Sequence, residues 1–308
     1  MDTTNAADKA SLPKASIWDG ASMTQDDMML RDAVLVLDHD DNVIGSESKK
    51  NAHVFSPSQP RGVLHRAFSV FLFDEESGDL LLQKRAASKI TFPNVWTNTC
   101  CSHPLHAMEP PEVDALAEVA DGSVPGSKHA AIRKLEHELG IAAEDVPHSS
   151  FVFLTRMHYW AADTVTHGKM SPWGEHEIDF VLFVSVKGAK KRGLFFARPR
   201  PDEVDDVWWI GHDDLARELV IEGGDRLWSP WFRLIAKKWL LGEGGWWKDV
   251  KKICAGKPTR HDDFGTIHRF DPPREHFGGA GEAGQWLGNL VVAPESKGDK
   301  DNALGNRD

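Results

Sequence analysis

The sequence predicts an α/β fold in which helices flank one mixed β-sheet. Three observations lead to this expectation: apolar runs of strand length, two segments with apolar residues at helical spacing, and aperiodic polar stretches at both ends. With 308 residues, of which 41% are hydrophobic, the chain is long enough for one large domain or two. We expect a single catalytic domain over residues 31–255 with a flexible tail on each side.

The first part of the chain predicts an arm and then the start of the sheet. Residues 1–30 are small, polar and aperiodic, so a disordered N-terminal arm is expected. Ordered structure then begins with a strand at 34–37, a turn and a second strand. Residues 66–73 are apolar on both faces, as in a covered strand, and they predict a hairpin with residues 79–85.

The middle of the chain predicts a loop followed by a helix. Residues 106–127 are rich in Pro, Glu, Asp and Gly and have no periodicity, which indicates an inserted surface loop. Ile132, Leu135 and Leu139 then recur at helical spacing, and Gly140 stands where a helix would end.

The second half predicts two strands, a helix and a tail. Residues 151–160 and 175–186 are strands by length and apolar content. Ser229 is the expected N-cap of a helix that stops at Gly242. Residues 256–308 are rich in Gly, Pro, Asp and Lys and are expected to be largely disordered.

The composition excludes several classes of partner. With 36 basic and 47 acidic side chains the net charge is -11, which argues against nucleic acid as a partner. The apolar runs are far shorter than the roughly 18 to 20 residues that span a bilayer, so no membrane insertion is expected. Three cysteines cannot form a disulfide framework and no targeting segment is visible, so we expect a cytoplasmic protein, as a monomer or weak dimer.

The motif TNTCCSHPL contains a candidate reactive cysteine. An isolated cysteine is usually a small buried hydrophobic residue, and Cys254 is interpreted so. Cys101 instead lies among polar residues, two positions before His103, so that both side chains share one face of an extended segment. A basic or metal-bound neighbour could hold such a thiol as a thiolate.

The motif WGEHEIDFVLF places Glu175 and Glu177 on one face of a strand. Two solvated glutamates at a strand end explain this spacing equally well. If both are charged and buried, however, they require a cation between them. His53, His65 and His103 could complete a five-ligand site for Zn, Mn or Mg.

The segment RKLEHELG resembles the second half of the Nudix box, the acidic helix with which Nudix hydrolases hold several Mg ions against a diphosphate. Lys134 and His137 stand where two of its glutamates are expected, and only Glu138 remains. The resemblance therefore implies one Mg ion at most, and hydrolysis is disfavoured.

Over about three quarters of its length the chain is similar to type I isopentenyl-diphosphate isomerases. The matching segments are, in order, KKNAHVF, GVLHRAFSVFLF, LLLQKRAASKITFPNVWTNTCCSHPL, RKLEHELGI, LTRMHYW, WGEHEIDFVLF and SPWFRLIA. The resemblance implies a Nudix-like α/β/α sandwich. It also implies interconversion of isopentenyl and dimethylallyl diphosphate, a homoallylic and an allylic substrate, through a tertiary carbocation.

The resemblance also implies roles for individual residues. The catalytic group is Cys101, Glu177 and Tyr159. The ligands of one divalent metal (Mg, Mn or Zn) are His53, His65, His103, Glu175 and Glu177. The contacts to substrate are Lys49, Arg85, Lys89, Ser102 and, at the hydrocarbon, Trp231, with Glu138 as ligand of a Mg ion that bridges to the diphosphate. Asn94 departs from the family, many of whose members have Gly there.

The reaction requires an acid and a base on opposite faces of the substrate. We assign Glu177, relayed with Tyr159, as the proton donor and the Cys101 thiolate as the base, although the reverse assignment fits equally well. Trp231 and Trp96 are candidates for an aromatic wall around the carbocation. Two alternatives are a Nudix hydrolase of a diphosphate, which needs an intact acidic helix, and a zinc-stabilised binding module, which would tolerate loss of Cys101.

Overall fold

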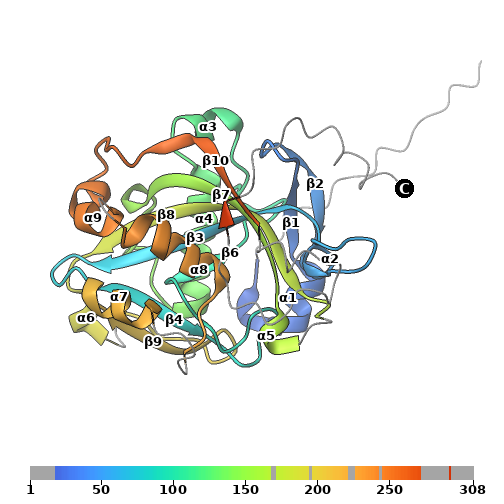
Figure 1. The fold of residues 1–308 in the computed structure, drawn as a ribbon, viewed down its shortest axis with the longest axis horizontal. Helices are drawn as coiled ribbons and strands as arrows, with labels where there is room; N and C mark the ends of the chain where they lie inside the picture. The colour runs from blue at the N-terminus through green and yellow to red at the C-terminus, as the bar shows by residue number, and fades with distance from the viewer. Residues whose placement is uncertain are drawn as a thin grey trace, which may run out of the picture.

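The computed structural model describes residues 18–167, 171–193, 196–220, 226–242, 245–271 and 291–292. In this part of the chain one mixed sheet of eleven strands forms the centre, and its main path runs β11-β10-β7-β8-β3-β1-β2 (Figure 1). The strands are β1 (Ala33–Leu37), β2 (Val43–Ser48), β3 (His65–Asp74), β4 (Leu80–Arg85), β5 (Trp96–Thr97), β6 (Cys100–Ser102), β7 (Val152–Ala162), β8 (Gly174–Val186), β9 (Val204–Ile210), β10 (Asp263–Asp271) and β11 (Val291–Val292).

The helices lie between and after these strands. They are α1 (Gln25–Arg31), α2 (Lys49–His53), α3 (Leu116–Ala120), α4 (Pro125–Leu139), α5 (Thr164–His167), α6 (Ala189–Arg192), α7 (His212–Val220), α8 (Pro230–Ile235) and α9 (Trp246–Cys254), with a π-helical turn (Ala236–Leu240) after α8 and 3-10 turns at Gly20–Ser22 and His148–Ser150. None of the helices in the described ranges combines the length and the hydropathy that a membrane crossing needs.

Two apolar cores on opposite faces of the sheet make the molecule a three-layer sandwich. Alternate residues of β8 belong to different cores: Val181 lies in the same core as Phe232 of α8, whereas Phe180 lies in the same core as Leu135 of α4. Figure 1 accordingly shows α8 and α9 on one side of the sheet and α4 on the other. The predicted α/β fold with one mixed sheet is confirmed.

Strands β3 and β8 form the buried centre of the sheet. They run parallel from the pair His65 and Glu177 to the pair Asp74 and Val186, and every residue of β3 is buried. The predicted hairpin of β3 with β4 is wrong beyond its turn: the two strands pair only at Phe73. Strand β4 instead pairs along its length with β9, from Leu80 to Arg85, and with β5 at Gln83 and Lys84.

Both predicted tails are partly ordered. The expected arm is wrong for residues 18–30, where Thr24 and Asp27 form a capping box and α1 buries Met28. The expected C-terminal disorder is wrong for β10, which adds to the sheet parallel to β7 and buries Phe270. The rest of these two expectations, on 1–17, 272–290 and 293–308, lies outside the described residues.

The predicted loop at 106–127 and the helix after Ser229 also need correction. The loop contains α3, and its Asp114 is buried because the carboxylate accepts hydrogen bonds from the amides of Gly126 and Ser127 in the first turn of α4. Ser229 caps α8 as predicted, since its hydroxyl accepts from the amide of Phe232, but the helix changes to a π-helical turn at residue 236.

Candidate active site

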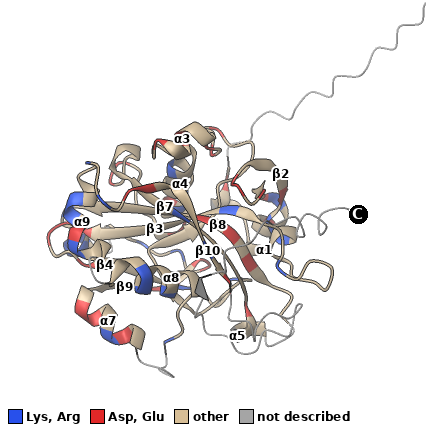
Figure 2. Ribbon diagram, turned by 45° about the horizontal axis from the view of Figure 1, so that its top comes forward, with Lys and Arg blue, Asp and Glu red and all other residues tan. Residues whose placement is uncertain are grey.

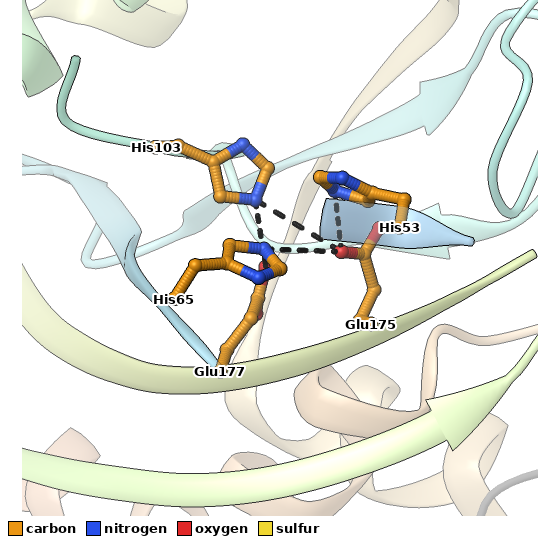
Figure 3. Close-up of side chains that lie close together, drawn as sticks. All are labelled: His53, His65, His103, Glu175 and Glu177. Atoms are coloured by element: carbon orange, nitrogen blue, oxygen red, sulfur yellow. Dashed lines mark hydrogen bonds and ion pairs between the residues drawn. The ribbon is translucent and has the colours of Figure 1, made fainter. Parts of the chain in front are cut away.

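Three histidines and two glutamates converge at one end of β3 and β8 (Figure 3). His53 ends α2, His65 begins β3 and His103 follows β6, while Glu175 and Glu177 share one face of β8. All five are buried, and one ligand atom from each lies within 4.8 Å of the others. Figure 2 shows acidic residues on β8, in the middle of the molecule. The structure thus joins the five residues that the sequence proposed as a metal site.

The hydrogen bonds of two imidazoles fix which nitrogen faces the cluster. Nδ1 of His53 lies 2.6 Å from the carbonyl of Lys49, and Nδ1 of His65 lies 2.8 Å from that of Val63. A carbonyl only accepts, so both Nδ1 atoms carry the proton and both Nε2 atoms present lone pairs. Nε2 of His53 lies 2.8 Å from Oε2 of Glu175, and neither atom has a hydrogen-bond partner. Two facing lone pairs at this distance need a cation, so the donor set fits a divalent metal.

The charges of the cluster agree with this interpretation. Burial, assisted by His53, lowers the pKa of His65 to about 3, so its imidazole is neutral as a metal ligand must be. Burial and the charge of Glu175 raise the pKa of Glu177 well above its usual range. Two carboxyls buried side by side are both ionised only when a cation lies between them.

A pocket opens beside the cluster, and the other residues singled out from the sequence line it. It is bounded by Lys49, Arg85, Lys89, Cys101, Ser102, Glu138, Tyr159 and Trp231, together with His103, Glu175 and Glu177 of the cluster. These residues come from α2, α4 and α8 as well as from several strands, so only the folded chain assembles them.

Cys101 and Glu177 reach the pocket from different strands. On β6, Cys101 pairs with Ser69 of β3, whereas Glu177 lies on β8 at the other edge of β3. Nη1 of Arg85 approaches the sulfur to 3.7 Å. Desolvation outweighs this guanidinium and raises the pKa of Cys101 to about 12. The free protein therefore favours the thiol form of Cys101, and the assignment of its thiolate as the base stays a prediction.

The aromatic wall of the pocket is Trp231. Its indole N–H donates to Oδ1 of Asn98 at 3.2 Å, and its ring meets Phe92 edge to face at 5.3 Å. Trp96, the other predicted candidate, does not line the pocket, since its ring packs against Trp208 at 5.8 Å. Trp96 lies on β5, and the pairing of β5 with β4 holds it in a different part of the sheet.

Three residues around the pocket were missed from the sequence. The hydroxyl of Thr91 donates to Oε1 of Glu175 at 3.0 Å. Lys134 pairs with Glu138 at 3.1 Å, and Glu203, which precedes β9, pairs with Lys89. Thr91 and Glu203 carry no sequence signal, whereas Lys134 was noted only as a departure from an acidic pattern.

The turn around Asn94 has the geometry that glycine favours. The φ angle of Asn94 is +61°, and its amide donates to the carbonyl of Arg85 at 3.0 Å. Asparagine is among the residues that tolerate this left-handed conformation. The departure from glycine therefore leaves the turn intact.

Comparison with known proteins gives a family and close relatives. Residues 63–232 match the NUDIX domain family. The chain is 41% identical over 254 residues to isopentenyl-diphosphate Delta-isomerase I, chloroplastic, of Arabidopsis thaliana, an alignment that covers 81% of this chain and 77% of that protein. It is 40% identical to isopentenyl-diphosphate Delta-isomerase I of Camptotheca acuminata (81% and 96% covered) and 40% identical to isopentenyl-diphosphate delta-isomerase of Candida albicans (78% and 81% covered).

Proposed function

The chain belongs to the isopentenyl-diphosphate Delta-isomerases that carry a Nudix domain, and we propose on this premise that its reaction takes place in the pocket lined by Cys101 and Glu177. The enzyme is an isomerase of isoprenoid synthesis that interconverts isopentenyl and dimethylallyl diphosphate. One observation supports this location most directly: Cys101, Tyr159 and Glu177 line the same pocket as Lys49 and Arg85. Proton-transfer groups therefore adjoin cations suited to a diphosphate.

Cys101 and Glu177 are the proposed proton-transfer pair. Moving the double bond adds a proton at C4 and removes one from C2, so an acid and a base must reach the five-carbon chain. Burial and the charge of Glu175 raise the pKa of the Glu177 carboxyl, which favours its role as the proton donor, and Tyr159 donates a hydrogen bond to it. Cys101 acts at the other carbon, and reversibility requires each group to work in both senses.

The cluster of imidazoles and carboxylates is proposed to hold one divalent metal, Mg, Mn or Zn. Its ligands would be His53, His65, His103, Glu175 and Glu177. When bound, the metal supplies positive charge that stabilises the ionised form of Glu177. The pairing of unprotonated Nε2 atoms with carboxylate oxygens supports this assignment.

The diphosphate is proposed to lie against Lys49, Arg85, Lys89 and Ser102, with Glu138 as ligand of a bridging Mg ion. Arg85 is anchored by its bonds to the carbonyls of Phe92 and Thr91 at 2.9 and 2.8 Å, so its guanidinium is held in place. Trp231 would face the hydrocarbon, where its ring stabilises a desolvated cation by roughly 2 kcal/mol.

The test is isotope incorporation by the purified enzyme in heavy water with Mg. Isopentenyl diphosphate should be converted to dimethylallyl diphosphate that carries deuterium, seen by NMR. Glu177→Gln should lose this conversion and retain the fold. Release of phosphate or pyrophosphate by the wild-type enzyme without isomerisation would instead support the hydrolase alternative.

We also propose a cytoplasmic enzyme that works as a monomer or weak dimer. The catalytic and substrate-binding residues expected from the sequence all line this one pocket, which supports a site that needs no residue from a partner subunit. The net charge of -11 supports the absence of a nucleic-acid partner. Sedimentation at micromolar concentration tests the oligomeric state, and microscopy of a fluorescent fusion tests the compartment.

A further inference from the structure

Lys134 is a buried cation between two carboxylates, one of which, Glu138, lines the pocket. The residue is 2% exposed. Its Nζ lies 3.1 Å from Oε1 of Glu138 and 3.9 Å from Oε1 of Glu203. A single ammonium therefore bridges an acid of α4 and an acid from the segment before β9, in the manner of a bound cation.

Other side chains hold the two acids in place. Oε2 of Glu138 accepts from Nε2 of Gln83 at 3.1 Å and from the thiol of Cys100 at 3.5 Å. Glu203 pairs with Lys89 through Oε2 and accepts from Gln25 through Oε1 at 2.9 Å. Lys134 thus occupies the space between the acids where another cation would find its ligands.

The charge balance of this region limits how many ions it can hold. Lys49, Arg85, Lys89 and Lys134 supply four positive charges, and Glu138 and Glu203 are its two carboxylates. This excess and one Mg ion are enough to balance a diphosphate. A second divalent ion would have to overcome repulsion by Lys134 at short range in a buried site.

The number of ions matters for the product. Dimethylallyl diphosphate is allylic, so stronger positive charge on its diphosphate favours cleavage of the bond between C1 and oxygen. The electron pair of that bond would leave with pyrophosphate, and water would add to the allylic cation and lose a proton, giving an alcohol.

We propose that Lys134 takes the place of a second divalent cation, and so restricts the diphosphate end of the pocket to one Mg ion and suppresses cleavage of the allylic product. This inference rests on the proposed function for its substrate, but the ion count does not depend on isomerisation. Lys134 is thereby a specificity-determining residue that acts through Glu138 and Glu203.

The experiment counts Mn ions bound per chain by electron paramagnetic resonance, with inorganic pyrophosphate as the probe. We expect Lys134→Glu to bind one more Mn than the wild type. We expect Lys134→Met, which has a neutral side chain of similar length, to reach half saturation at a several-fold lower Mn concentration. Lys128→Met is the matched control, because Lys128 is also a poorly exposed lysine of α4 but has Asp114 and Asp121 as its charge partners instead of Glu138 and Glu203.

Product cleavage is measured separately, as pyrophosphate released from dimethylallyl diphosphate with Mg. Lys134→Glu should release it at least tenfold faster than the wild type and Lys128→Met. An unchanged ion count in folded Lys134→Glu, or weaker Mn binding by Lys134→Met, overturns the inference. If Lys134→Glu does not fold by circular dichroism, Lys134→Met alone decides. If the ion counts are as expected but the wild type does not isomerise its substrate, the proposed function is refuted. The role of Lys134 in limiting the number of bound ions then still stands.

Discussion

The hydroxyl of Tyr159 donates a hydrogen bond of 2.6 Å to Oε2 of Glu177. The two residues lie opposite each other on β7 and β8, and both are buried. Burial, followed by the charge of Glu177, raises the pKa of Tyr159 well above its usual value of about 10. The phenol of the only tyrosine in the sequence therefore stays protonated and serves as a donor to the proposed catalytic carboxyl.

Replacing Tyr159 with Phe should reduce kcat about 10-fold to 100-fold. The substitution removes one hydrogen bond to an ionisable group, worth about 1.5 to 3 kcal/mol, and leaves the ring in the core. The KM for isopentenyl diphosphate should stay at the wild-type level, and the metal is kept in excess because the hydroxyl also bonds the proposed metal ligand Glu177. Steady-state kinetics check this, and an unchanged kcat would exclude a role for the hydroxyl.

Replacing Cys101 with Ala should abolish turnover. A group that transfers a proton in the reaction contributes roughly 10²-fold to 10⁴-fold to the rate. The fold and the metal content should persist, since the five converging ligands do not include the thiol. Cys254→Ala is the matched control and should keep wild-type activity in the deuterium assay. Loss of metal together with the thiol would make Cys101 a ligand and contradict its assigned role.

The parts of the site predicted from the sequence are those with a local pattern. Glu175 and Glu177 follow from alternation along one strand, and the side chains of Cys101 and His103 were expected on one face for the same reason. The choice of His53 and His65 among 15 histidines depended on the family resemblance, since composition does not distinguish them. Local periodicity thus identifies candidates, and similarity to relatives selects among them.

The parts that were missed depend on long-range contacts or on a weak local signal. Glu203 meets Lys89 and Lys134 only after β9 pairs with β4. Strand β10 joins the sheet mainly through its backbone, because only Phe270 of this strand is fully buried, so its sequence shows no alternation. The helix after Thr24 did carry a capping box, with Asp in place of the commoner Glu, and the polar composition concealed it.

Thr91 should position the metal ligand Glu175, and Thr91→Val should weaken metal binding about 10-fold to 100-fold. The hydroxyl holds Oε1 of Glu175, which leaves Oε2 directed at the imidazoles. Partners of this kind typically contribute that much to metal affinity. Competition with a chromogenic chelator measures the affinity, and Thr91→Ser should restore it. Equal affinities for all three proteins would show that Thr91 only fills space.

Asn94 is expected to matter for the backbone conformation of its turn and not for the function of its side chain. At a φ of +61° an alanine is strained, so Asn94→Ala should lower the free energy of unfolding by about 1 kcal/mol. Asn94→Gly should change it by less than about 0.5 kcal/mol, because relief of strain is offset by the greater entropy of glycine in the unfolded chain. Urea unfolding measures both. A larger loss for Gly than for Ala would mean that the side chain itself is needed.

His158 is held neutral inside a chain of hydrogen bonds. Nη1 of Arg269 lies 2.7 Å from its Nδ1, and its Nε2 lies 3.0 Å from Nε2 of His176. A guanidinium only donates, so Nδ1 accepts and the proton of His158 lies on Nε2. Burial, followed by His176 and Arg269, lowers the pKa of His158 well below its usual value of about 6.5.

Acid should therefore destabilise the fold through His158, and His158→Gln should reduce this effect. Below pH 6.5 the unfolded chain binds a proton at this residue and the folded chain does not. The stability that neutral His158 contributes is thus present above pH 6.5 and is lost as the pH falls. One such group accounts for up to about 1.4 kcal/mol per pH unit. The free energy of unfolding is measured in urea at pH 7, 6 and 5, and it should fall less steeply with pH for His158→Gln than for the wild type, by up to that slope. Parallel pH profiles would show that the folded protein protonates His158 as readily as the unfolded chain does.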